Sequence, residues 1–272
     1  MAAAAHPFAF AESDTNIPLV RAPLVRTIAQ VRFPHLTRFS TNEDAVGKKV
    51  ADALADQYPL MEIGQEVTMT ITADGVSEDR STTRLFRLLS GDRHWQITFC
   101  GSFLSIDTTQ YVRRRDFAQR LVDAWKALNG HVAVPYISRL GVRYVNQLTQ
   151  PDLLGRLPEL LRPEVLGISK SQHEEEAELL SAVTEARYRL PGEASFMARW
   201  GMLPAGTTLD SSVPTYDYPT WMLDTDSFRE FAPGTQQGGD LYEDVRDLAL
   251  RGYQFFRWAV TEEFLIAFGG EV

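Results

Sequence analysis

In residues 24–33, LVRTIAQVRF, near the start of the chain, every second position from Val25 to Phe33 is apolar except Thr27. Val25 and Phe33 begin and end this apolar series, and Arg26 and Arg32 lie among the polar residues between them. Side chains of a β-strand point alternately to its two faces, so this period predicts a strand with one buried face. We therefore expect a half-buried strand here, ended by the proline that follows it.

A second stretch with charged residues at alternate positions, RLGVRYVN at 139–146, lies in the middle of the chain. Tyr144 falls on one face of the predicted strand with the apolar residues, whereas Arg139 and Arg143 fall on the other face. Asn146 shares the face of Tyr144, so we expect its amide to be buried, structural and hydrogen-bonded to backbone at the strand end, in the loop leading to the next helix. Replacing Arg143, on the opposite face, is expected to cost little stability.

The remaining patterns predict further strands and helices. Strands are expected at residues 67–73, 83–89, 93–99, 102–108, 176–190, 194–203 and 220–228, with loops at 74–81 and 204–219. Amphipathic helices are expected from Asn42, over 113–129, over 151–167 with breaks at its prolines, from about Gly239, and after Thr261 as an N-cap. Residues 176–190 fit either a helix or a strand, and the strand is favoured because a turn and an apolar partner stretch follow.

These elements predict an α+β fold in which helices pack on one face of an antiparallel sheet. The expected order is β-α-β-β-β-β-α in residues 17–134 and β-α-β-β-β-α in residues 135–272, after a flexible tail at 1–16. Both parts begin on a strand containing Val-Arg-aromatic, which indicates an internal duplication within one continuous pseudo-symmetric unit. A chance match of short strings is the alternative. Element order favours a saddle or helix-grip-like sheet, by analogy alone.

Four short motifs stand out along the chain. They are APLVRTIAQVRF, ISRLGVRYVN, LDTDSF and WAVTEEFLIAF. In these motifs the chain resembles a sporadically distributed family of uncharacterised bacterial proteins of about this length. Members of the family share an N-terminal Pro-Leu strand, a central strand ending in aromatic-x-Asn, an Asp-x-Asp strand and a C-terminal Thr-Glu helix. The resemblance covers nearly the whole chain, and it implies a bacterial protein but no particular activity.

Composition and charge narrow the classes of partner. With 44% hydrophobic and 23% charged residues, the chain has the composition of an ordinary globular protein. No apolar run approaches the ~20 residues that span a bilayer, and the single cysteine, Cys100, is typical of a reducing compartment. We therefore expect a cytoplasmic protein without a membrane partner. Residues 137–272 carry the entire formal charge of −9, which disfavours nucleic acid as a partner.

The sequence contains none of the common signatures of catalysis or cofactor binding. There is no glycine-rich phosphate loop, no Gly-x-Ser-x-Gly, no His-Glu-x-x-His and no cysteine pair. We therefore expect no cofactor, and the scattered histidines predict no metal site. Asp224 and Asp226 are the candidate catalytic pair, because strand alternation puts both carboxylates on one face, where they could serve acid–base work or hold a cation. Capping, or pairing with arginines, is the favoured alternative.

Arg26, Arg32, Arg139 and Arg143 are expected on the face of the sheet that the helices leave free. They could bind a small anionic ligand, or they could pair with acidic residues of neighbouring strands, which is the favoured interpretation. These features predict a noncatalytic cytoplasmic binding or adaptor protein for an unidentified protein or small anionic ligand. Its binding surface would be the open sheet face or a groove between the sheet and the long helix. A hydrolase-like or cation-dependent enzyme using the two aspartates is the alternative.

Overall fold

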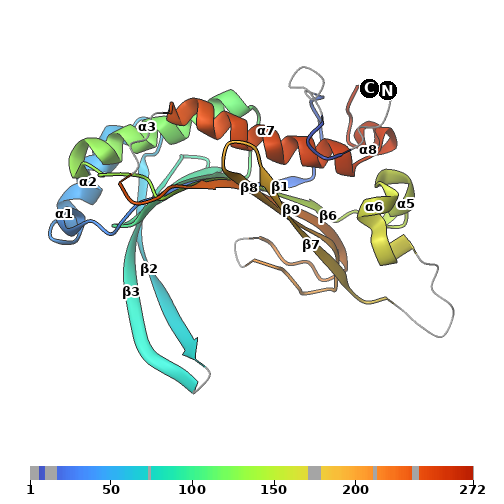
Figure 1. Cartoon of the computed structure of the whole chain (residues 1–272), viewed down its shortest axis with the longest axis horizontal. Helices are drawn as coiled ribbons and strands as arrows, with labels where there is room; N and C mark the ends of the chain where they lie inside the picture. The colour runs from blue at the N-terminus through green and yellow to red at the C-terminus, as the bar shows by residue number, and fades with distance from the viewer. Residues whose placement is uncertain are drawn as a thin grey trace. The chain divides into compact units, whose positions relative to one another are not determined.

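The computed structural model describes residues 6–9, 17–72, 75–170, 179–210, 213–234 and 239–271. Within them the chain has the predicted α+β architecture, with helices and one antiparallel open sheet (Figure 1). The strands are β1 (Leu24–Arg32), β2 (Leu60–Thr72), β3 (Gly75–Leu89), β4 (Trp95–Phe99), β5 (Phe103–Thr108), β6 (Arg139–Leu148), β7 (Ala182–Leu190), β8 (Ala194–Leu203) and β9 (Thr220–Glu230). The helices are α1 (Thr37–Ser40), α2 (Glu43–Leu54), α3 (Arg114–Val132), α4 (Pro151–Leu154), α5 (Leu157–Leu160), α6 (Pro163–Leu166), the 3-10 helix η2 (Gly167–Lys170), α7 (Leu241–Ala259) and α8 (Glu262–Ala267).

Hydrogen bonds join the described strands in the order β2-β3-β4-β5-β1-β6-β9-β8-β7. The chain divides into two compact units. Unit 1 contains Met1–Thr27, Gly141–Arg229 and Val245–Val272, and unit 2 contains Ile28–Leu140 and Glu230–Asp244. Each unit is therefore assembled from more than one stretch of chain. The internal duplication stays a prediction.

In unit 2, helices pack on one face of the strands through aromatic side chains. Phe86 of β3 lies opposite Phe99 of β4, and their rings stack with centroids 5.3 Å apart. A Cβ atom added to Gly47 of α2 would lie 2.4 Å from the Phe86 ring, so this helix approaches the sheet as closely as glycine allows. On α3, the Arg120 guanidinium lies 4.3 Å from the ring centroid of Trp95, a cation–π contact.

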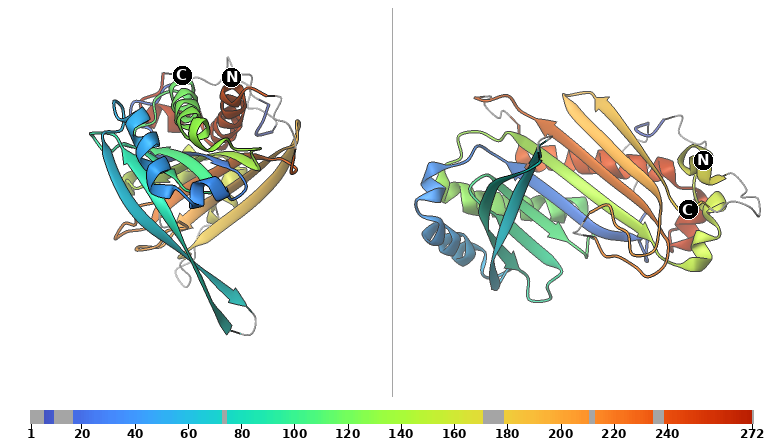
Figure 2. Two further views of the ribbon diagram at one scale, coloured as in Figure 1. Left: turned by 90° about the vertical axis from the view of Figure 1, so that its left-hand side faces the viewer. Right: turned by 90° about the horizontal axis from the view of Figure 1, so that it is seen from below.

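Strands β2 and β3 of unit 2 form a long hairpin. Their register runs from Leu60 opposite Leu89 to Thr72 opposite Gly75, whereas β4 pairs only with the last residues of β3, from Phe86 to Leu89. The remainder of the hairpin is therefore a two-stranded ribbon that extends beyond the other strands of the unit (Figure 2).

In unit 1, α7 packs on one face of the strands in the order β6-β9-β8-β7 (Figure 1). Phe255 of α7 contacts Phe196 and Trp200 of β8, with ring centroids 5.2 and 5.8 Å apart. A Cβ atom on Gly252 would lie 2.7 Å from the Tyr144 ring of β6, so glycine lets the helix axis approach the sheet here. Tyr144 therefore faces the helix, as its place in the alternation predicts.

The boundaries differ from the sequence prediction in two places. Residues from Gly75 onward, expected to be a loop, belong to β3, because cross-strand pairing with β2 outweighs the local turn preference of glycine, aspartate and serine. The ambiguous segment is a strand from Ala182 to Leu190, and its predicted start at 176–178 lies outside the described residues. The predicted N-cap is confirmed, since the Thr261 side chain accepts a hydrogen bond from the Phe264 backbone N–H at 3.2 Å.

The helices of the described residues are between 4 and 19 residues long. None of them combines the length and the apolar character that crossing a bilayer requires.

Candidate functional site

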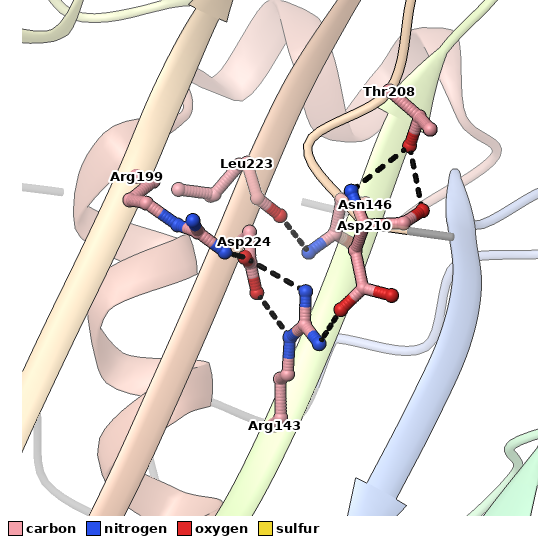
Figure 3. Close-up of polar contacts among 7 residues, drawn as sticks. All are labelled: Arg143, Asn146, Arg199, Thr208, Asp210, Leu223 and Asp224. Carbon is pink, nitrogen blue, oxygen red and sulfur yellow. Dashed lines mark hydrogen bonds and ion pairs between the residues drawn. The ribbon is translucent and has the colours of Figure 1, made fainter. Parts of the chain in front are cut away.

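A network of two arginines and two aspartates lies on the face of unit 1 that points away from α7 (Figure 3). Arg143 of β6 donates from Nε to Oδ1 of Asp224 at 2.7 Å and from Nη2 to Oδ2 at 3.0 Å. Arg199 of β8 donates from Nη2 to the same Oδ2 at 2.7 Å. Asp210 accepts a further hydrogen bond from Nη1 of Arg143. Both oxygens of Asp224 are thus engaged by guanidinium groups.

Strand register explains how the network forms. Asp224 of β9 lies directly opposite Arg199 of β8, so both side chains point to the same face. Strand β6 adjoins β9 on its other side, and there Arg143 alternates with Tyr144, which faces α7. Three adjacent strands therefore direct one carboxylate and two guanidinium groups to a common point.

The charges of this network must balance, because its side chains are largely buried and a buried charge without compensation is costly. The Asp224 side chain is fully buried, whereas those of Arg143 and Arg199 are 19% and 27% exposed. Burial lowers the pKa of Arg143, but the hydrogen bonds and negative charges of Asp224 and Asp210 raise it by more. The net shift is upward, so the guanidinium stays charged. The two positive and two negative groups compensate one another.

The loop between β8 and β9, residues 204–219, covers part of this face. Asp210 is positioned by Thr208, whose Oγ1 accepts from the Asp210 backbone N–H at 3.2 Å and donates to its carbonyl oxygen at 2.8 Å. Val213 packs on a buried cluster that includes Val145 of β6. The sequence predicted that the sheet face around Arg143 is free. This prediction is wrong at Arg143, because a loop without regular structure packs its own apolar and acidic residues on the strands.

The other predicted arginines do not join this network in the described contacts. Arg26 is partly buried in unit 1, and its neighbour Val25 packs on the Val145 cluster, so strand alternation directs Arg26 to the opposite face. Arg32 and Arg139 belong to unit 2. Arg32 is exposed and donates from Nε to the Gln30 side chain at 2.6 Å.

The two candidate catalytic aspartates lie in different surroundings. Asp226 shares a face of β9 with Asp224 but is half-buried, and it lies opposite Met197 of β8. Asp224 is bound by arginines, which is the alternative that the sequence favoured for it. Among the residues that the structure describes, no group of three or more histidine, cysteine, aspartate and glutamate side chains is arranged to hold a metal ion.

Asn146 lies on the helix-facing side of β6, as predicted. Its side chain is buried, with 6% of the residue surface exposed, and Nδ2 donates to the backbone carbonyl of Leu223 at 3.5 Å. The partner is thus a backbone oxygen within the neighbouring strand β9, and the predicted location at the strand end is wrong. This long bond makes Asn146 a weak cross-link between two central strands.

An aromatic contact in unit 1 was not predicted from the sequence. Phe8 packs edge-on against Tyr188 of β7 and Phe196 of β8, with ring centroids 5.3 and 5.1 Å apart. It also contacts Phe255 of α7 at 6.4 Å, and the preceding Pro7 is buried. We call Tyr188, Phe196 and Phe255 the aromatic site. A proline followed by phenylalanine in an alanine-rich segment was the signal that could have found it.

Comparisons with known proteins identify no family for this chain. A scan against protein-family models finds no match, and a search of the curated proteins also finds none. Function is therefore inferred from the geometry of the chain itself.

Proposed function

We propose that the protein is a noncatalytic binding or adaptor protein that engages a protein partner at the aromatic site of unit 1. One observation carries this proposal. Phe8, which is about 180 positions or more away in the sequence, packs its ring against Tyr188, Phe196 and Phe255. A surface between strands and a long helix that accepts a short segment remote in sequence has the properties of a peptide-binding surface.

The alternative surface, the sheet face that bears Arg143, supports ligand binding less well. Arg143 makes three hydrogen bonds to carboxylates within its own chain. An anionic ligand would have to displace Asp210 and lift the 204–219 loop, whose Val213 is buried against the strands. Binding there would begin with the loss of existing contacts.

The competing class is a hydrolase-like or cation-dependent enzyme that uses Asp224 and Asp226. A cation at Asp224 would meet the guanidinium groups of Arg143 and Arg199, each within hydrogen-bonding distance of its carboxylate. Like charges repel strongly at such distances in a buried site. The same two arginines stabilise the ionised carboxylate and so oppose its action as a proton acceptor. The geometry therefore favours binding over catalysis.

A selection of peptide ligands tests the proposal. The full chain carrying Phe8→Ala would be immobilised and screened against a displayed library of random peptides. Enriched peptides would then be measured against the same chain carrying Tyr188→Ala as well, with Arg187→Ala as the control on the opposite face of β7. We expect binding that is lost with Tyr188→Ala and kept with Arg187→Ala. Selected peptides that all bind independently of Tyr188 would contradict the proposal.

A further inference from the structure

We infer that the aromatic site recognises segments of other proteins in which a proline precedes an aromatic residue within a β-turn, and that residues 6–9 are a resident copy of such a segment. This inference rests on the proposed function, because it names the partner of the same site. It follows from the local structure of the seated segment, from the placement of the rings that receive Phe8, and from the tether that holds the segment in place.

Residues 6–9 form a compact turn. The Ala9 backbone N–H donates to the His6 carbonyl oxygen at 3.2 Å, which closes a four-residue turn with Pro7 in its second position. The Phe8 backbone N–H donates to Nδ1 of the His6 side chain at 3.3 Å. Proline fixes one backbone dihedral in the value that this turn position requires. The segment therefore loses little conformational freedom when it binds.

The aromatic site is held by regular elements and favours an aromatic ring in a defined orientation. Tyr188 and Phe196 lie opposite each other on β7 and β8, and both meet Phe8 edge-to-face, at interplanar angles of 79° and 80°. Phe255 of α7 contacts Phe8 and Phe196, and Phe255 and Phe196 are almost completely buried. Edge-to-face pairing depends on the ring quadrupole, so an aliphatic side chain would not reproduce it.

The tether makes residues 6–9 a competitor for any partner. The Ile17 backbone N–H donates to the Tyr253 hydroxyl of α7 at 3.1 Å, which anchors the chain close after residues 6–9. Because the turn is covalently linked to this anchor, it cannot diffuse away from the site. A tethered segment acts at an effective concentration on the order of 1 mM. A partner must outcompete it, so its apparent Kd on the parent chain exceeds its Kd for the open site by a factor of 1 plus the effective concentration divided by the intrinsic Kd of the turn. Occupancy by the tethered turn requires an intrinsic Kd below about 0.1 mM.

The test uses the full chain and a labelled peptide of residues 1–9, followed by fluorescence anisotropy. The Phe8→Ala chain is expected to bind this peptide at least about tenfold more tightly than the parent chain does. Peptides carrying Pro7→Ala or Phe8→Ala are expected to bind weakly. Adding Tyr188→Ala to the Phe8→Ala chain should abolish binding, whereas adding Arg187→Ala, an exposed neighbour on β7, should preserve it.

The outcomes separate this inference from the proposed function. If library peptides bind the Phe8→Ala chain through Tyr188 but the 1–9 peptide does not, the turn specificity is wrong and the proposed function stands. Failure of both, in a chain that melts like the parent, overturns both. Equal affinity of the 1–9 peptide for the parent and Phe8→Ala chains would show that residues 6–9 do not compete for the site.

Discussion

Replacing Asp224 by alanine should strongly destabilise unit 1. The change removes a fully buried carboxylate that accepts three hydrogen bonds from Arg143 and Arg199. Removing one partner of a buried ion pair costs about 3 to 5 kcal/mol, because the remaining charge is left without compensation. Arg143 keeps Asp210, and Arg199 is 27% exposed, so we expect a loss near the lower end, about 3 kcal/mol.

Asp210→Ala is the matched control. Its side chain is 27% exposed and contacts only one of the two arginines in the described network, and Arg143 keeps both bonds to Asp224. We expect a loss of about 1 kcal/mol or less. Urea unfolding followed by tryptophan fluorescence measures both changes. Trp200 lies on β8 next to Arg199, and Trp221 lies on β9, the strand that carries Asp224. A loss of 3 kcal/mol corresponds to a fall of about 1 to 3 M in the urea midpoint.

A double replacement tests the physical reason for this difference. Arg143→Met combined with Asp224→Leu removes one charge of each sign and keeps the volume apolar, but it also takes a partner in the network from Arg199 and from Asp210, which are each 27% exposed. It should therefore restore only part of the stability that Asp224→Ala loses. The reasoning is refuted if Asp224→Ala unfolds at the midpoint of the parent, or if Asp210→Ala costs more than Asp224→Ala.

Other changes probe the remaining features of unit 1. Gly201→Ala should cost about 1 to 3 kcal/mol in the same assay, because Gly201 has φ +146° and an added Cβ would lie 1.8 Å from the Ala182 carbonyl oxygen. Asn146→Ala should cost about 1 kcal/mol, and Arg143→Ala should cost more; the reverse ranking would refute the buried ion-pair argument. Burial raises the pKa of Tyr188, so its neutral ring contributes stability below pH ~10 that is lost as the pH rises through the higher folded value. Phe8→Ala should lower this pKa towards its ordinary value, as measured by ultraviolet titration, and an unchanged pKa would show that Phe8 does not cover the ring.

The faces of β6 were predictable because they depend on local periodicity. The alternation in β6 assigned Tyr144 and Asn146 to the helix side and Arg143 to the other side, and the structure places all of them so. Pairing of Asp224 with an arginine was favoured for the same reason, since neighbouring strands align side chains on a face.

The ion-pair partners, the covering loop and the Phe8 contact could not be predicted, because they depend on contacts between residues distant in the sequence. Arg143 and Asp224 are 81 positions apart, and Arg143 and Asp210 are 67 apart, so the sequence gives no measure of which carboxylate reaches which arginine. The expectation that replacing Arg143 costs little stability assumed an open face, and the covering loop and the buried Asp224 remove that assumption. Phe8 was missed because the Pro-Phe pair, although visible in the sequence, does not show that β7, β8 and α7 build a site for it.

The way the chain is divided between the units has a consequence for synthesis on the ribosome. Most of unit 2 is one continuous stretch, Ile28–Leu140, whose contacts become available early in translation. Unit 1 needs Val245–Val272, which leaves the ribosome after all of unit 2, before Phe8 and the strands can meet Phe255. Closing such long loops is slow, so nascent unit 1 exposes its apolar strands longer than unit 2. We expect chaperones that bind extended apolar chain to contact unit 1 in preference.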